Sequence, residues 1–187
     1  MAGTFYEVDW STLPAPEDDG AVAHLTGLAL PPVPLASTGG GTVDLAALPG
    51  LTIVYIYPKT GQPGTEMPDG WDMIPGARGC TPQSCAFRDH FAELKALGVT
   101  TLFGLSTQDT AYQTEARDRM ELPFELVSDA GLALTGALGL PTFEAGGETL
   151  IKRMSLAIED GRIEHVIYPV FPPDRNAQLV ADWLKRR

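Results

Sequence analysis

The chain has 187 residues, two cysteines and a formal net charge of −11. This length predicts one domain with room for an arm, and it is enough to bury a core without disulfide bonds. Two cysteines exclude a disulfide-rich secreted scaffold, and with three scattered histidines they argue against a closed zinc site. The acidic balance argues against nucleic acid or an anionic membrane as a partner, because both require a basic surface.

The N-terminal residues carry neither the basic cluster nor the apolar core of a signal peptide. The longest apolar run, residues 51–57, is too short to span a membrane. We therefore expect a reducing, cytoplasmic compartment, in which two nearby cysteines are more often reactive than structural.

Residues 1–24 are predicted to form an arm, docked by Phe5, Tyr6 and Trp10, and residues 25–187 a single domain. The prolines at 31–34 and the glycines at 39–41 break helices and predict short strands around a tight turn. Residues 51–57 are β-branched, aromatic and almost entirely apolar, which predicts a central strand covered on both faces.

Residues 59–79 are rich in Gly and Pro and have no periodic pattern, which predicts a long functional loop. Its apolar side chains would form a patch if exposed, so we expect a lid over the site or a partner surface; they are Met67, Trp71, Met73 and Ile74. A helix is predicted over residues 80–98, because four apolar residues recur at helical spacing before the stop at Gly98.

The remaining chain alternates between strand and helix patterns. Strands are predicted at 99–106 and 124–128, helices at 110–120, 132–138 and 176–185 (with Asp174 as a possible N-cap), and a hairpin of 149–158 and 162–168. Residues 140–143 are interpreted as a plain turn. The alternation predicts a three-layer α/β domain with a mixed central sheet.

Cys80 stands where the Gly-rich loop meets the start of a predicted helix. Free N–H groups and the positive end of the helix dipole stabilise a thiolate there, and a nearby arginine would add to this effect. The alternative is that both cysteines are small buried hydrophobic residues. The polar flank at 76–79 favours reactivity for Cys80, whereas Cys85 has weaker support.

Cys85 lies five residues after Cys80. In a regular helix this spacing separates the Cα atoms by roughly 8–9 Å, beyond the limit of about 6.8 Å for a disulfide. If the two residues form a disulfide, the first turn of the helix must unwind. The spacing suits a cysteine that first reacts with another molecule and is then resolved by its partner.

The segment Gly79–Asp89, preceded by Tyr55–Lys59, resembles the active-site segment of peroxiredoxins, most closely the peroxiredoxin Q or bacterioferritin comigratory protein type. Downstream matches extend the resemblance over residues 25–187. It implies a thioredoxin-like fold, Cys80 as the peroxidatic cysteine, Cys85 as the resolving cysteine and Arg153 as the active-site arginine. Without the resemblance, Arg153 reads as a surface cation, and Arg78 is the rival because it lies two residues from Cys80.

The chain departs from the family pattern before Cys80. The family places a Pro seven residues and a Thr three residues before the peroxidatic cysteine. Here Pro58 stands 22 residues before Cys80 and Ala77 takes the Thr position, so about fifteen residues appear inserted, within 59–79. Thr60 or Thr81 could replace the hydroxyl, although an ordinary loop residue is the preferred interpretation of Thr60.

The resulting hypothesis is a thiol peroxidase that reduces hydrogen peroxide and small organic hydroperoxides. A Cys80–Cys85 disulfide would be recycled by thioredoxin or a similar dithiol protein, with no metal, haem, flavin or nucleotide cofactor. The alternatives are a thiol–disulfide reductase and a non-catalytic redox sensor. The sequence leaves monomer and homodimer open.

Overall fold

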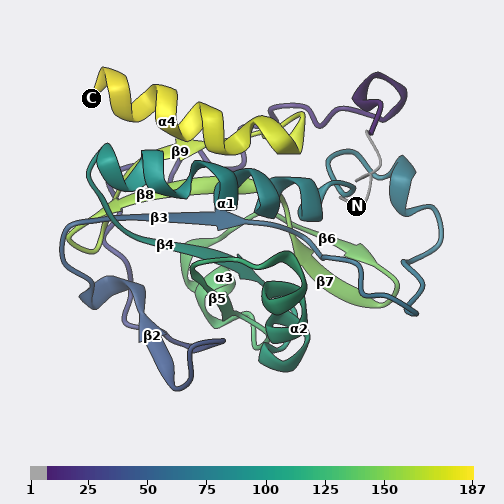
Figure 1. Cartoon of the computed structure of the whole chain (residues 1–187), viewed down its shortest axis with the longest axis horizontal. Coiled ribbons are helices and arrows are strands. Elements are labelled where there is room, and N and C mark those ends of the chain that lie inside the picture. Colours follow the sequence, from purple (N-terminus) through teal and green to yellow (C-terminus); the bar gives the residue numbers. More distant parts are fainter. Residues whose placement is uncertain (1–7) are drawn as a thin grey trace.

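The computed structural model describes residues 8–187 and contains a mixed seven-stranded sheet with helices on both faces (Figure 1). The strands lie in the order β2-β1-β5-β4-β3-β8-β9, and β6 and β7 form a separate two-stranded sheet. The strands are β1 Pro34–Ser37, β2 Thr42–Asp44, β3 Leu51–Ile56, β4 Val99–Ser106, β5 Glu125–Ser128, β6 Thr142–Ala145, β7 Glu148–Ile151, β8 Met154–Glu159 and β9 Arg162–Ile167. The predicted three-layer α/β architecture is confirmed.

Four α-helices and four 3-10 turns complete the elements of residues 8–187. They are η1 Trp10–Thr12, η2 Leu45–Ala47, η3 Trp71–Met73, α1 Cys80–Ala96, α2 Thr110–Met120, α3 Ala133–Leu138, η4 Pro173–Arg175 and α4 Asn176–Arg186. No helix in this part of the chain is long and apolar enough to cross a membrane.

Strand β3 forms the centre of the sheet and leads to the site. It pairs with β4 in parallel and with β8 in antiparallel orientation, and all six of its residues are buried. A strand covered on both faces needs apolar residues at every position, which explains its unbroken apolar run. The predicted central strand is therefore confirmed.

Two apolar cores lie on opposite faces of the sheet. Helices α1 and α4 run side by side over one face (Figure 1), while α3 and the segment around Leu25 and Leu30 cover the other. On the first face Tyr55 of β3 stacks on Phe87 of α1, with ring centroids 4.4 Å apart. The Tyr55 hydroxyl also donates to Ser84 Oγ at 3.1 Å. These contacts fix α1 above the carboxyl end of β3.

The predicted strand over residues 149–158 is wrong as a single element. It consists of β7, which pairs with β6, and β8, which pairs with β3 and β9. The break falls at Lys152 and Arg153, where the Lys152 N–H donates to Pro141 O at 2.9 Å. Strand β6 begins at Thr142, where the sequence predicts a plain turn. Its residues are extended because they pair with β7, and the local sequence does not reveal that pairing.

The predicted N-cap of the last helix is also wrong. Asp174 belongs to η4, and its carboxylate accepts a hydrogen bond at 3.1 Å from the indole N–H of Trp10. Trp10 also packs edge to face on Phe171, at 6.2 Å between ring centroids. Docking of the N-terminal segment by Trp10 is thus confirmed, while Phe5 and Tyr6 lie outside the described residues.

The segment 59–79 is irregular apart from η3, as the sequence predicts. Its apolar side chains do not form one exposed patch, because Trp71 is buried in a small third cluster with Ala77, Ala145 and Leu150. Met73, by contrast, is 69% exposed. The segment is therefore anchored to the β6–β7 hairpin.

Candidate active site

Cys80 is the first residue of α1 and is only 3% exposed. The N-cap before it is Gly79, whose φ of 109° suits glycine and strains other residues. A Cβ at Gly79 would lie 2.6 Å from Pro173 and 2.8 Å from Trp10. The glycine therefore allows η4 and the N-terminal segment to approach closely at the start of the helix.

Three groups contact the Cys80 sulfur. Arg153 Nη2 lies 3.3 Å from Sγ, and the Lys59 backbone N–H donates to Sγ with an N···S distance of 3.4 Å. The Ala77 carbonyl lies 3.7 Å away and accepts the S–H of the neutral thiol. A positively charged donor and a peptide donor therefore both point at the Cys80 sulfur.

Arg153 is 3% exposed and sits between β7 and β8. Its guanidinium donates to the carbonyls of Gly76, Ala77 and Arg78 and to the Gln83 side-chain oxygen. No carboxylate within residues 8–187 forms a salt bridge with it. Burying a charged group is costly unless it is hydrogen-bonded, and these carbonyl and amide oxygens supply acceptors for the Arg153 guanidinium.

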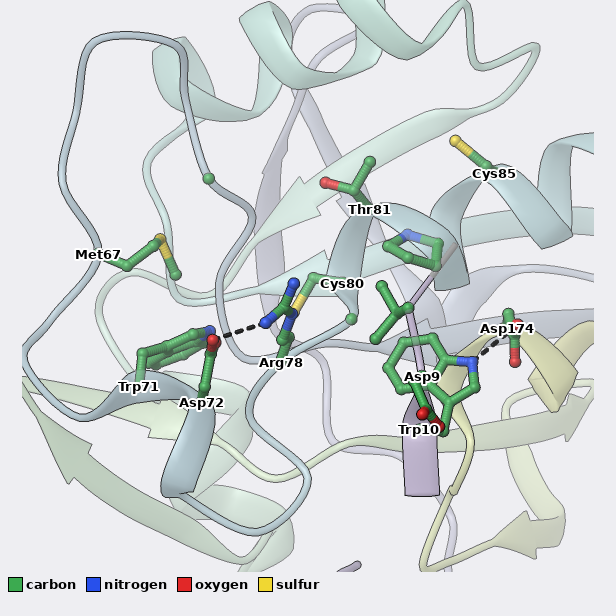
Figure 2. A pocket seen from close by; sticks show the side chains of 14 residues that line it. Asp9, Trp10, Met67, Trp71, Asp72, Arg78, Cys80, Thr81, Cys85 and Asp174 are labelled. Carbon is green, nitrogen blue, oxygen red and sulfur yellow. Dashed lines mark hydrogen bonds and ion pairs between the residues drawn. The ribbon is translucent and has the colours of Figure 1, made fainter. Parts of the chain in front are cut away.

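The guanidinium of Arg78, the rival arginine, pairs with Asp72 at 2.6 Å rather than with the Cys80 sulfur. Arg78 lines a groove beside Cys80 (Figure 2), and its backbone carbonyl accepts from Arg153. Proximity in sequence was therefore misleading, because residues 76–78 present their carbonyls to the site.

A buried pair of amide side chains, Gln83 and Asn176, lies behind Arg153 and has no recognisable motif in the sequence. Gln83 Nε2 donates to Asn176 Oδ1 at 2.8 Å, and Ser155 Oγ donates to the same oxygen at 2.8 Å. Since Asn176 accepts from the Gln83 amide nitrogen, the Gln83 oxygen is left to face Arg153. The only sequence signal for these residues is a polar side chain near the start of a helix, which is weak evidence.

Cys85 lies on the same continuous helix, half-buried, and both cysteines are free thiols. Burial raises the pKa of the Cys85 thiol, and the nearby Arg88 opposes this effect. The intact helix holds the Cα atoms of Cys80 and Cys85 roughly 8–9 Å apart, so a disulfide requires the first turn to unwind.

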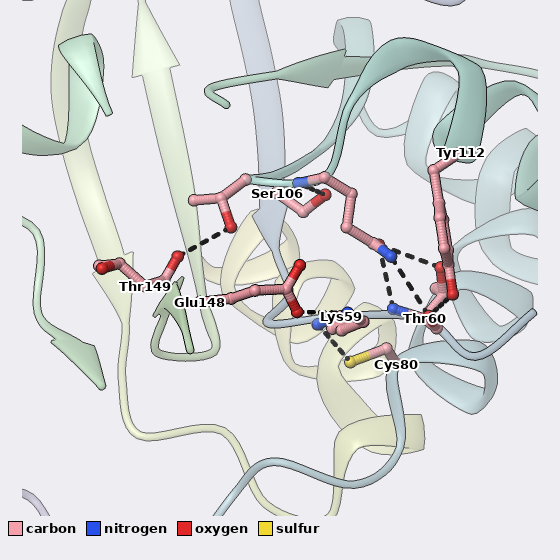
Figure 3. Close-up of polar contacts among 9 residues, drawn as sticks. Lys59, Thr60, Cys80, Ser106, Tyr112, Glu148 and Thr149 are labelled. Atoms are coloured by element: carbon pink, nitrogen blue, oxygen red, sulfur yellow. Dashed lines mark hydrogen bonds and ion pairs between the residues drawn. The ribbon is translucent and has the colours of Figure 1, made fainter. Parts of the chain in front are cut away.

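Thr60 is completely buried, which differs from its interpretation as an ordinary loop residue. Figure 3 shows it beside Lys59 and Cys80, with the Tyr112 hydroxyl donating to the Thr60 carbonyl at 3.0 Å. The Thr60 hydroxyl donates to Gln108 Oε1 at 3.1 Å. Ala77, at the position of the family's Thr, is buried and contributes only its backbone.

A groove with a volume of about 1210 Å³ opens above the two cysteines (Figure 2). Met67 and Trp71 line it from the irregular segment, and Trp10 and Asp174 line it from the opposite side. Thr81 lines the same groove beside Cys80. Its mixed apolar and polar walls suit a small molecule that carries an apolar group.

Comparison with known proteins gives a consistent result. Residues 21–181 match the family model described as Redoxin. The chain is 32% identical over 160 residues to "Peroxiredoxin Bcp" of Escherichia coli K12, covering 83% of this chain and 92% of that protein. It is 30% identical over 152 residues to "Peroxiredoxin Q, chloroplastic" of Oryza sativa subsp. japonica, and the match covers 80% of this chain but 62% of the rice protein.

Solved structures share the fold. "Peroxidoxin BcpB" from Mycobacterium tuberculosis superimposes with a TM-score of 0.69 at 23% identity, covering 87% of this chain and 98% of that one. A peroxiredoxin Q from Xanthomonas campestris gives a TM-score of 0.67 at 24% identity, covering 86% of this chain and 96% of that one. At these identities the structural likeness establishes the thioredoxin-like fold.

Proposed function

Because the chain belongs to the Redoxin family and is a peroxiredoxin of the Q/Bcp group, we propose that it is a thiol-dependent peroxidase. The observation that carries the proposal is the convergence of Arg153 Nη2 and the Lys59 N–H on the buried Cys80 sulfur, at 3.3 and 3.4 Å. Both donors stabilise the nucleophilic anion, and the arginine also stabilises the negative charge that develops on peroxide oxygen.

In the first step the Cys80 thiolate attacks the terminal oxygen of the peroxide. An S–O bond forms and the O–O bond breaks, so the sulfur is oxidised by two electrons and the peroxide is reduced. The leaving oxygen takes a proton and departs as water or an alcohol. The product on the protein is Cys80 sulfenic acid.

In the second step the Cys85 thiol condenses with this sulfenic acid, forming a disulfide and releasing water. The two residues share α1, so one chain suffices, but the first turn of the helix must unwind. A dithiol protein of the thioredoxin type then reduces the disulfide and becomes oxidised itself. The proposal takes residues 25–187 as the catalytic domain and a reducing cytoplasm as its location.

Mass spectrometry after one equivalent of hydrogen peroxide tests the proposal. We expect a loss of about two mass units, mapped to a Cys80–Cys85 disulfide. With Cys85→Ser we expect a sulfenic acid on Cys80 and no sustained turnover with thioredoxin. The matched variant Cys80→Ser should not consume peroxide.

Peroxide consumption by Cys80→Ser at the wild-type rate would overturn the assignment of the nucleophile. Sustained turnover by Cys85→Ser would overturn the intramolecular second step. Stoichiometric oxidation of the wild type without turnover would indicate a redox sensor, whereas reduction of insulin disulfides without peroxide would indicate a thiol–disulfide reductase.

A further inference from the structure

The Lys59 N–H is a donor to Cys80 that comes from a segment distant in sequence. It lies just after Pro58, where the chain leaves β3, and 21 positions before Cys80. Peptide groups beyond the end of a strand lack the strand's regular partners, so other contacts must pair and orient them. The orientation of this donor therefore depends on what holds residues 59 and 60.

The Gln108 side chain holds Thr60 at several points. Its Oε1 accepts from both the Thr60 N–H and the Thr60 hydroxyl at 3.1 Å, and its Nε2 donates to the Thr60 carbonyl at 3.3 Å. A carboxamide carries an acceptor and a donor, so it can pair with both backbone groups of one residue as a neighbouring strand would. We call this arrangement, formed by Gln108 and Thr60, the amide clamp.

Gln108 itself is fixed by the ends of two strands. Its backbone N–H donates to Ser106 Oγ at 3.3 Å, and its carbonyl accepts from Ser128 Oγ at 2.6 Å. Gln108 as a whole is only 7% exposed. The clamp is thus anchored at the ends of β4 and β5, next to the end of β3. Through it, the rigid sheet fixes the position of residues 59 and 60 beside Cys80.

We propose that Gln108 is a positioning residue, which holds the Lys59 N–H on the Cys80 thiolate and so supports its reactivity. This inference rests on the proposed role of Cys80 as the nucleophile. The chain has Ala77 in place of the family's hydroxyl, and the clamped peptide N–H provides a hydrogen-bond donor to the sulfur. The Thr60 hydroxyl is engaged by Gln108, so Thr60 contributes through its backbone.

The competing explanation is that the Thr60 hydroxyl turns to Cys80 and acts directly. Two variants separate these explanations. Gln108→Met keeps the approximate volume of the side chain and removes every bond of the clamp. Thr60→Val removes only the hydroxyl and leaves both backbone groups paired with Gln108.

The experiment uses the Cys85→Ser background, in which Cys80 is the only cysteine. The readouts are the pH profile of iodoacetamide alkylation and the stopped-flow rate of oxidation by hydrogen peroxide. For Gln108→Met we expect the alkylation midpoint to rise by about one pH unit, and oxidation below the midpoint to slow about tenfold. Thr60→Val should move the midpoint much less.

Gln178→Met is the control. Gln178 is half-buried on α4, and its side chain bonds to His90 and Asp182 rather than to a residue of the clamp or of its anchors. We expect it to keep the wild-type alkylation midpoint even where it lowers thermal stability. If Gln108→Met does not fold, Tyr112→Phe provides a milder test, because it removes only one bond to the Thr60 carbonyl and should raise the midpoint by a smaller amount.

A wild-type alkylation profile in folded Gln108→Met, or in Tyr112→Phe where Gln108→Met does not fold, would overturn the inference. A shift in Thr60→Val equal to that of Gln108→Met would assign the role to the hydroxyl instead. If peroxide fails to oxidise Cys80 in the wild-type protein, the proposed function fails, and the alkylation profiles still report on the clamp alone.

Discussion

At the scale of single residues, the contacts of Arg153 require a guanidinium rather than another positively charged group. Its planar guanidinium donates in several directions at once, to three backbone carbonyls, to Gln83 and to the Cys80 sulfur. A lysine ammonium is a compact charge on a flexible chain and cannot donate to all of these acceptors at once. The arginine both fixes residues 76–78 and presents charge to the sulfur.

We therefore expect Arg153→Lys to slow oxidation of Cys80 by hydrogen peroxide on the order of 10²-fold, since misplaced charge loses electrostatic stabilisation. Stopped-flow kinetics at a fixed pH measures this rate. Lys152→Met is the control, because the neighbouring cation pairs with Asp19 instead. Equal rates in wild type and Arg153→Lys would show that the guanidinium geometry is unimportant.

At the scale of elements, the proposed function requires α1 to be stable enough to position Cys80 and yet able to open for Cys85. The start of the helix is covered by Trp10, which lies against Gly79 and Phe171 and bonds to Asp174. Unwinding the first turn moves Gly79 and Cys80, so it must disturb this contact. The N-terminal segment therefore stabilises the closed form of the helix.

Trp10→Ala should accelerate disulfide formation about threefold to tenfold, because lost aromatic contacts lower the cost of opening the turn. The first step, attack of Cys80 on peroxide, should change little. Two-phase stopped-flow fluorescence or quenched mass spectrometry separates these steps.

Trp183→Ala is the matched control for Trp10→Ala. It removes the same side chain from α4, where Trp183 stacks on His165 rather than on Gly79. Unchanged or slower disulfide formation in Trp10→Ala would show that the segment does not restrain α1.

At the scale of the whole molecule, the N-terminal segment is tied to the sheet region by Asp19. Its carboxylate accepts from Lys152 Nζ at 2.9 Å and from the Tyr168 hydroxyl at 2.8 Å. The hydrogen bond from Lys152, followed by that from Tyr168, lowers the pKa of Asp19 from 3.8 to about 2. A carboxylate with a lowered pKa stabilises the folded state while it is ionised in that state.

The stabilisation from Asp19 should be complete above its ordinary pKa and disappear as the pH falls from about 4 towards 2. Asp19→Asn should therefore have a lower Tm than wild type at pH 7, and the difference should shrink over that interval. Thermal unfolding followed by circular dichroism measures it. Asp18→Asn is the control, and a Tm difference that does not depend on pH would contradict the prediction.

Much of the local structure could be predicted because its signals lie within short stretches. The apolar run of β3 and the helical spacing of Phe87, Phe91 and Leu94 each depend on residues close in sequence. The strand at 149–158 was predicted wrongly for the same reason, since its pattern does not reveal that the chain changes partners at Lys152. The missed β6 exists only because β7 lies beside it.

The sequence by itself determined the fold class, the family and the placement of Cys80 at a helix start, because periodicity and a contiguous motif carry that information. The family resemblance indicated Arg153, but only the tertiary structure decided that its guanidinium, rather than that of Arg78, contacts the sulfur, and that Gln108 holds Thr60. These contacts join residues 73 and 48 positions apart. Such pairs meet because the carboxyl ends of the parallel strands β3 and β4 and the start of the antiparallel strand β8 lie at one edge of the sheet. Short stretches of sequence contain no signal for these contacts.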